Sequence, residues 1–329
     1  MPPDAAPRRS MISLVKALVA IAVACAIWSA LRQNWPTVAR TAAQLDTGWL
    51  LVAFVLGFGY RVANACGWPL VLAALRARLP VARGVRIWLV SETMRWLPGG
   101  VWGFSSRVYS ANQAGVPAAT ASLSLALELL LTIAAWTLVA VVGVGSSGLL
   151  AEWLRRISLP TLVLAVAVAL GLLGGAVLLA RRFPGHRYAK KARGFLADLR
   201  AVLARRPRVS LLLATLALYT VLGALHGVAF YALIRGFTSA APSPATVVGI
   251  NAVGWLIGFF AICAPGGLGV REGGMAALLA PLVPLEVAIG SVILWRVMQI
   301  ATEALWLAVF LLPDGVRNAR TWLGQARTT

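Results

Sequence analysis

Long apolar runs dominate this chain, and several of them are long enough to cross a bilayer. A membrane-spanning helix needs about 20 consecutive, predominantly apolar residues. Six runs meet that length and predict full spans, near residues 11–31, 48–75, 118–142, 159–180, 209–234 and 285–312. Two more segments, 85–116 and 245–283, are each interrupted by the tripeptide Pro-Gly-Gly. The pattern therefore predicts an all-α polytopic membrane protein, a single transmembrane domain with about six full spans and two broken, re-entrant helical hairpins.

The two Pro-Gly-Gly tripeptides indicate an internal repeat. They lie at residues 98–100 and 265–267, an offset of 167 residues, and Pro117 and Pro284 recur at the same offset. Self-similarity at a fixed offset is the sequence signature of internal repetition. Interrupted helices at corresponding places in two halves of a membrane protein are typical of transporters. We expect repeat 1 at about residues 48–142 and repeat 2 at about residues 209–312.

The distribution of basic residues predicts how the spans are oriented. Hydrophobic residues make up 60% of the chain and charged residues only 12%, yet the net charge is +20. Positive charge favours the cytoplasmic side, and it gathers at the N-terminus, at residues 76–86, at residues 181–208 and in the C-terminal tail. Placing these segments inside puts both termini in the cytoplasm and gives the two repeats opposite orientations. The first apolar run is long enough to favour a retained anchor helix over a signal peptide.

The connector at residues 181–208 carries ten of the 30 Lys and Arg residues. A basic amphipathic helix at this place suits an anionic membrane surface, whereas an ordinary cytoplasmic loop would carry similar charge. Both interpretations stay open, and neither needs nucleic acid as a partner. The apolar positions that follow a helical spacing are Phe195, Leu196, Leu199, Val202 and Leu203.

Each Pro-Gly-Gly break predicts a turn between two half-helices. The half-helix after the turn begins with free N–H groups and the positive end of its dipole, which favours an anion. Arg107 follows the first break, and Arg271 and Glu272 follow the second. We expect both arginines to meet one phosphate-bearing headgroup; the alternative is that the breaks are surface loops with snorkelling arginines. Glycine lets backbone approach a ligand, so the candidate substrate-binding positions also include Gly99, Gly100, Gly266 and Gly267.

Ionisable and amide side chains also lie within the predicted full spans. A charge at the bilayer centre costs about 2.5–3.5 kcal/mol on insertion scales, so such residues usually face the bundle interior beside a partner. Arg296 and Glu303 lie on one helical face, and we expect them to pair. A structural ion-pair network and a path for substrate or protons both fit the pattern. The network comprises Arg61, Asn64, Glu128, Arg296, Gln299 and Glu303.

Other residues indicate packing rather than chemistry. A lone histidine in a span, His226, is more often a hydrogen-bonded packing residue than a functional one. The three cysteines and two histidines show no metal-ligand spacing, so we expect neither a metal nor a cofactor. The motifs of an ATP-driven pump or a lipase-type hydrolase are absent from the sequence. Tryptophans near predicted span ends are interpreted as interfacial anchors: Trp35, Trp49, Trp88 and Trp153.

The sequence around the second break resembles a known family. Residues 265–273, followed by 276–279, 284–288 and 294–296, are similar to the flippase-like membrane region of lysylphosphatidylglycerol synthases. Residues 97–103 with Arg107, Gly115 and Glu128 resemble the first half of that region, although Leu129 stands where relatives often have arginine. The resemblance covers nearly the whole chain. It implies a multi-pass inner-membrane protein that moves lipids or lipid-linked molecules between leaflets.

We therefore expect a flippase-like transporter of an anionic or amphiphilic lipid. One alternative is a non-transporting membrane protein that recruits a lipid-modifying or envelope-assembly enzyme, and a homo-oligomer is compatible with either. Another is an integral membrane transferase with Glu272 as base. We expect no lipid aminoacylation by this chain, because its sequence does not include the soluble aminoacyl-transferase domain of the full synthases.

Overall fold

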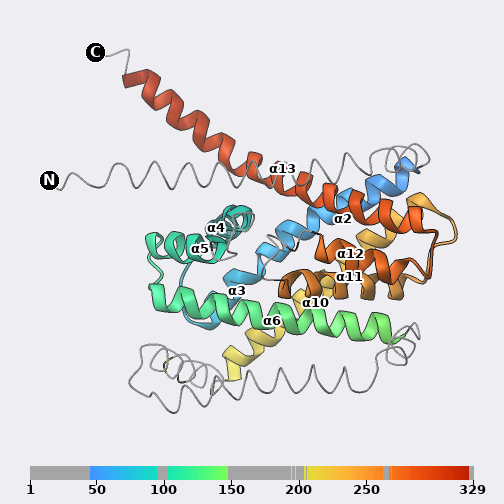
Figure 1. The fold of residues 1–329 in the computed structure, drawn as a ribbon. Coiled ribbons are helices and arrows are strands. Elements are labelled where there is room, and N and C mark those ends of the chain that lie inside the picture. Colours follow the sequence, from blue (N-terminus) through green and yellow to red (C-terminus); the bar gives the residue numbers. More distant parts are fainter. Residues whose placement is uncertain are drawn as a thin grey trace, which may run out of the picture.

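The structure, a computed structural model, describes residues 45–94, 102–146, 206–261 and 269–325, with isolated positions 194, 197, 204 and 267. All regular secondary structure in these ranges is helical (Figure 1). The predicted spans at 11–31 and 159–180, three of the four break glycines (Gly99, Gly100 and Gly266) and most of the basic connector lie outside the described residues. The helices are α2 (Thr47–Ala65), α3 (Gly67–Ala74), α4 (Val81–Thr93), α5 (Trp102–Gln113), α6 (Ala118–Gly145), α10 (Arg206–Phe237), α11 (Pro244–Phe260), α12 (Val270–Leu279) and α13 (Leu285–Gln325).

Among the described residues, four helical segments are long and apolar enough to cross a membrane. They are Thr47–Ala74, which joins α2 and α3 through a turn at Cys66, then α6, Arg208–Phe237 of α10, and Leu285–Trp306 of α13. They correspond to the spans predicted at 48–75, 118–142, 209–234 and 285–312. The protein is therefore an α-helical membrane protein.

The two broken segments fold as pairs of short helices. α4 packs against α5, and α11 packs against α12. At a rise of 1.5 Å per residue, the 13, 12, 17 and 10 residues of these helices correspond to about 15–26 Å, which is less than the roughly 30 Å hydrocarbon core. Each pair leads into a long helix, α6 or α13, as Figure 1 shows for both halves of the chain.

Local signals in the sequence explain where several helices begin. The Asp46 carboxylate accepts a hydrogen bond from the Gly48 N–H at 2.8 Å and caps α2. The Ser243 hydroxyl accepts one from the Thr246 N–H at 3.2 Å and caps α11. Such caps satisfy N–H groups that the helix itself leaves unpaired. Pro117 and Pro284 immediately precede α6 and α13, where a proline does not interrupt helical hydrogen bonds.

Close glycine contacts let α11 pack tightly at the centre of the bundle. A Cβ atom on Gly143 of α6 would lie 2.6 Å from the Gly249 Cα atom of α11. Gly267, before α12, has a φ of +71°, and a Cβ atom there would lie 2.8 Å from the Gly258 Cα atom. These backbone contacts leave no room for side chains, so they hold the second helix pair against its neighbours.

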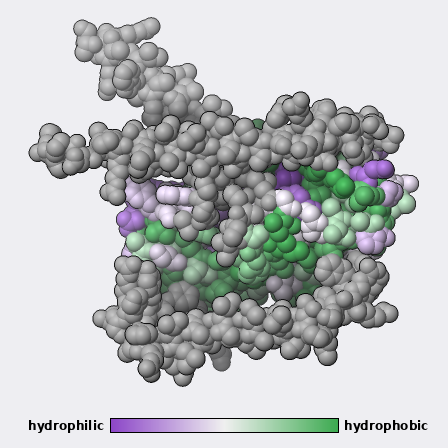
Figure 2. Space-filling model, in the orientation of Figure 1, coloured by the Kyte–Doolittle hydropathy of each residue, from purple (hydrophilic) through white to green (hydrophobic). Residues whose placement is uncertain are grey.

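In Figure 1, α13 and α6 lie on opposite sides of the bundle, and the short helices α4, α5, α11 and α12 lie between them. The largest cluster of buried apolar side chains draws on α10, α11, α12 and α13. Figure 2 shows apolar side chains across the described middle of one face, with polar ones mainly toward its left and right margins. This arrangement encloses the polar groups described next.

Candidate functional site

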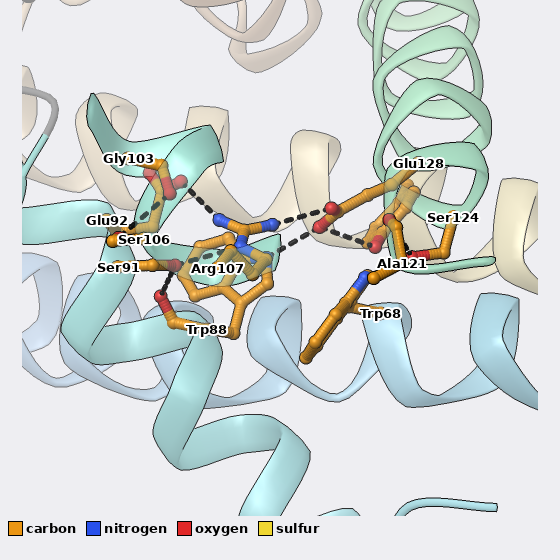
Figure 3. A network of polar contacts seen from close by, with 11 residues as sticks. Trp68, Trp88, Ser91, Glu92, Gly103, Ser106, Arg107, Ala121, Ser124 and Glu128 are labelled. Atoms are coloured by element: carbon orange, nitrogen blue, oxygen red, sulfur yellow. Dashed lines mark hydrogen bonds and ion pairs between the residues drawn. The ribbon is translucent and has the colours of Figure 1, made fainter. Parts of the chain in front are cut away.

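Arg107 of α5 lies at the centre of a buried polar cluster (Figure 3). Its side chain is only 2% exposed. The guanidinium Nη1 lies 2.6 Å from a Glu128 carboxylate oxygen, and Nη2 lies 2.7 Å from one of Glu92. The Nε–H donates to the Ser91 hydroxyl at 2.8 Å. Each nitrogen of the guanidinium therefore has a polar partner on α4 or α6. We call the following residues the Arg107 cluster: Arg107, Ser91, Glu92, Glu128, Trp68 and Trp88.

Two tryptophans complete the Arg107 cluster. The guanidinium carbon of Arg107 lies 5.1 Å from the centroid of the Trp88 ring and 5.7 Å from that of Trp68, within the range of cation–π attraction. The Trp88 indole N–H donates to Glu128 at 2.5 Å, and the Trp68 N–H donates to the Ser124 hydroxyl at 3.0 Å. The cluster thus combines charge pairing with aromatic packing, and both offset the free-energy cost of burying the arginine charge.

Trp88 corrects one expectation from the sequence. We interpreted it as an interfacial anchor, but its side chain is 5% exposed and its N–H is bonded to Glu128 inside the bundle. The short helix α4 turns this residue inward because its neighbours along the face, Val85 and Leu89, belong to the same buried core. Trp49 is 36% exposed, and Trp35 and Trp153 lie outside the described residues.

A second set of charged residues, buried or half-buried, joins α2, α12 and α13. Arg61 of α2 forms an ion pair with Glu303 of α13. Arg296 Nε lies 3.1 Å from a Glu272 carboxylate oxygen, and the other Glu272 oxygen accepts the Gly269 N–H at 2.7 Å. The expected Arg296–Glu303 pair is therefore replaced by two pairs between helices. α12 and α2 pack against α13. Arg296 and Glu303 therefore find nearer partners on those helices than each other, two turns away on α13.

Arg61 and Arg271 line the same pocket. Arg271 is the second residue of α12 and is 8% exposed. It packs against α11 at Gly258, where a Cβ atom would lie 2.9 Å from the Arg271 Cβ atom. Arg107 does not line this pocket. The residues that do are Phe54, Gly57, Tyr60, Arg61, His226, Trp255, Arg271, Trp295, Met298, Gln299 and Thr302.

The polar wall of the pocket is built around His226 of α10. Its Nδ1 lies 3.0 Å from the Asn251 amide nitrogen, and its Nε2 lies 3.3 Å from the Gln299 side-chain amide. With the Gln299 amide oriented so that its oxygen faces these groups, that oxygen accepts from the Trp295 N–H at 2.8 Å and from Arg271 at 3.3 Å. Nδ1 then accepts from Asn251 while the Nε2–H donates to Gln299, as in a neutral imidazole.

Aromatic rings hold the imidazole of His226 in place. The centroids of Tyr60, Trp295 and Trp136 lie 4.5, 4.9 and 5.4 Å from that of His226. The expectation that His226 is a hydrogen-bonded packing residue is confirmed. Its position on the pocket wall also makes it part of the candidate site.

The structure divides the residues that the sequence singled out between two places. Arg271, Arg61 and Gln299 line the pocket, with Glu303, Glu272 and Arg296 beside them in ion pairs, whereas Arg107 and Glu128 form the Arg107 cluster. Asn64 is half-buried on α2. In the described part of the chain, no three His, Cys, Asp or Glu side chains lie together as a metal site would require. Sequence reasoning missed Ser91, Glu92, Tyr60 and Asn251.

Of the missed residues, Glu92 carried the clearest signal. It is an acidic residue in an apolar segment that leads into a Pro-Gly-Gly break, and a buried acid in such a place needs a cation. Asn251 and Tyr60 carried no comparable signal, because amide and phenol groups are common in helices of all kinds. Their role depends on which helices pack together.

Comparison with known proteins places the chain in a family. No curated protein matches it. Residues 13–306 match the family described as the lysylphosphatidylglycerol synthase TM region. The matched range includes both helix pairs, the Arg107 cluster and the pocket. The protein belongs to the lysylphosphatidylglycerol synthase TM region family.

Proposed function

We propose that this protein is a flippase-like transporter that moves an anionic or amphiphilic lipid, or a lipid-linked precursor, between the leaflets of the inner membrane. Its family indicates a membrane function related to lipids. The observation that carries the proposal is the pocket between α2, α10, α11, α12 and α13, into which both Arg61 and Arg271 face.

The chemistry of the pocket suits a phosphate-bearing headgroup. Arginine presents a planar fork of N–H donors that matches phosphate oxygens. Arg271 also lies in the first turn of α12, near the positive end of that helix. Gln299 and Thr302 add an amide and a hydroxyl, while the rings of Phe54 and Trp255 supply apolar walls for the adjoining part of a lipid.

Two correspondences between the halves of the chain support the proposed internal repeat. Adding 167 to Trp102 and Ala118, where α5 and α6 begin, gives positions 269 and 285, next to the start of α12 and at the start of α13. In each half the helix after the break is also ion-paired to the following long helix. Arg107 pairs with Glu128 in the first half and Glu272 with Arg296 in the second, so the signs are reversed. Rocking of one such repeat against the other would give alternating access to the pocket.

Transfer chemistry is not part of this proposal. A transferase would need Glu272 as a free base, but its carboxylate accepts the Gly269 N–H and pairs with Arg296.

The direct test of transport is reconstitution of the full chain in vesicles with a fluorescent short-chain phosphatidylglycerol. If the protein is a transporter, labelled lipid from the inner leaflet should become accessible to a membrane-impermeant reductant added outside. The rate should rise with the amount of protein in the vesicles. A rate equal to that of protein-free vesicles would count against the proposal.

The proposed topology makes a separate prediction for the connector between α10 and α11. With both termini cytoplasmic, Ala240 lies outside the cell and Arg78, between α3 and α4, lies inside; both are exposed. On a background without Cys25, Cys66 and Cys263, a cysteine replacing Ala240 should therefore react with a membrane-impermeant maleimide in intact cells. A cysteine replacing Arg78 is the matched control and should react only after permeabilisation. Labelling of both positions from the same side would overturn the inverted arrangement.

A further inference from the structure

Both arginines of the pocket have polar partners on α13. Arg61 is ion-paired to Glu303, which is 6% exposed and is not among the pocket-lining residues. Arg271 contacts a neutral group, the side-chain amide oxygen of Gln299 at 3.3 Å. The Arg61 guanidinium is therefore already paired with a carboxylate, that of Glu303 on α13.

A phosphate and a carboxylate use the guanidinium of arginine in the same way. Both accept paired N–H donors from one edge of the planar fork. An anionic headgroup that entered the pocket and engaged Arg61 would compete with Glu303 for those donors. Arg61 would keep a second contact, because its guanidinium carbon lies 6.0 Å from the centroid of the Trp88 ring.

We infer that Glu303 is a built-in counter-ion of the pocket, which holds Arg61 when the pocket is empty and is displaced when an anionic headgroup binds. The inference rests on the proposed function of the pocket and adds a residue that sets its affinity. Binding breaks the Arg61–Glu303 pair, and release of the lipid restores it. The carboxylate thereby prevents the headgroup from being held too tightly to leave.

A change that removes only the charge of Glu303 tests this role. Glu303→Gln keeps the shape of the side chain but no longer competes for Arg61. The purified full chain in detergent would be titrated calorimetrically with dihexanoyl phosphatidylglycerol, a short-chain anionic lipid, below its micelle concentration. We expect the Kd of Glu303→Gln to fall about tenfold, a change equivalent to about 1.4 kcal/mol. Vesicle transport by the same variant should become slower, because release is impaired.

Glu128 provides the matched control. It is a buried carboxylate paired with an arginine, as Glu303 is, but Arg107 does not line the pocket. Glu128→Gln should leave the Kd for the lipid within twofold of the wild-type value. If Glu303→Gln does not fold, Glu303→Asp serves instead, since its shorter side chain weakens the same ion pair and should also lower the Kd.

The outcomes separate this inference from the proposed function. A folded Glu303→Gln or Glu303→Asp variant whose Kd is unchanged or higher overturns the counter-ion role, even if the wild type binds and Arg271→Ala does not. Tighter binding in both Glu303→Gln and Glu128→Gln also overturns it, because the effect would then follow net charge alone. If neither the wild type nor Glu303→Gln binds the lipid, both the counter-ion role and the proposed site are wrong.

Discussion

Replacing Arg271 with alanine should reduce lipid translocation by about tenfold to a hundredfold, because hydrogen bonds to a charged group contribute roughly 1.5–3 kcal/mol and each 1.4 kcal/mol is a factor of ten. In the proposed site, Arg271 would offer the headgroup a fork of donors at the start of α12. Arg271→Lys should recover only part of the rate, since lysine keeps the charge but not the fork. Rates would be measured in vesicles with the fluorescent short-chain lipid.

The control for Arg271 is an arginine outside the pocket. Arg235, near the end of α10, donates to the Ser239 carbonyl at 2.9 Å and lies over the Trp49 ring. Arg235→Ala should translocate lipid at the wild-type rate. The thermal midpoint of Arg271→Ala should also stay close to that of the wild type, because water can enter the pocket where the side chain was. Full activity of both Arg271→Ala and Arg61→Ala would exclude this pocket as the lipid site.

Most of the helical framework could be predicted from the sequence because bilayer crossing depends on one local property, the length of an apolar run. The four long helices in the described residues occupy predicted spans. The Pro-Gly-Gly tripeptides likewise marked where helices are short, since proline and glycine interrupt helices whatever surrounds them. These signals need no knowledge of which segments are neighbours.

The partners of the buried charges could not be predicted in the same way. The cost of burying a charge identified Arg61, Arg296 and Glu303 as residues that need partners, but not which partners they find. Arg296 and Glu303 share a helix face, yet each pairs with a residue from another helix. Such pairs depend on how α2 and α12 pack against α13, which is a long-range property of the fold.

The two arginines that follow the breaks illustrate the same limit. From the sequence, Arg107 and Arg271 looked equivalent, each close to a half-helix start. In the structure Arg107 is surrounded by Glu92, Glu128 and Ser91, whereas Arg271 faces the pocket. The difference comes from α4, which supplies two of the three polar partners of Arg107. We therefore propose headgroup binding for Arg271 with Arg61, and a structural role for Arg107.

That structural role predicts the largest loss of stability for a single change. Arg107→Ala should destabilise the protein by about 3–5 kcal/mol, because it leaves the buried Glu128 carboxylate, and the half-buried Glu92 beside it, without the arginine. Intrinsic tryptophan fluorescence during thermal unfolding in detergent is a suitable measurement, since Trp68 and Trp88 pack directly on the guanidinium.

A double variant distinguishes loss of pairing from loss of packing. Arg107→Met combined with Glu128→Gln removes both charges of the closer pair and keeps most of the side-chain volume. It should be more stable than Arg107→Met alone, because only the single variant leaves Glu128 charged and without its arginine. Glu128 is less exposed than Glu92, so solvent screens its pairing with Arg107 less and this coupling should be the stronger of the two. Equal midpoints for the wild type and Arg107→Ala would show that the cluster does not stabilise the fold, and Arg107 would again be a candidate for binding the headgroup.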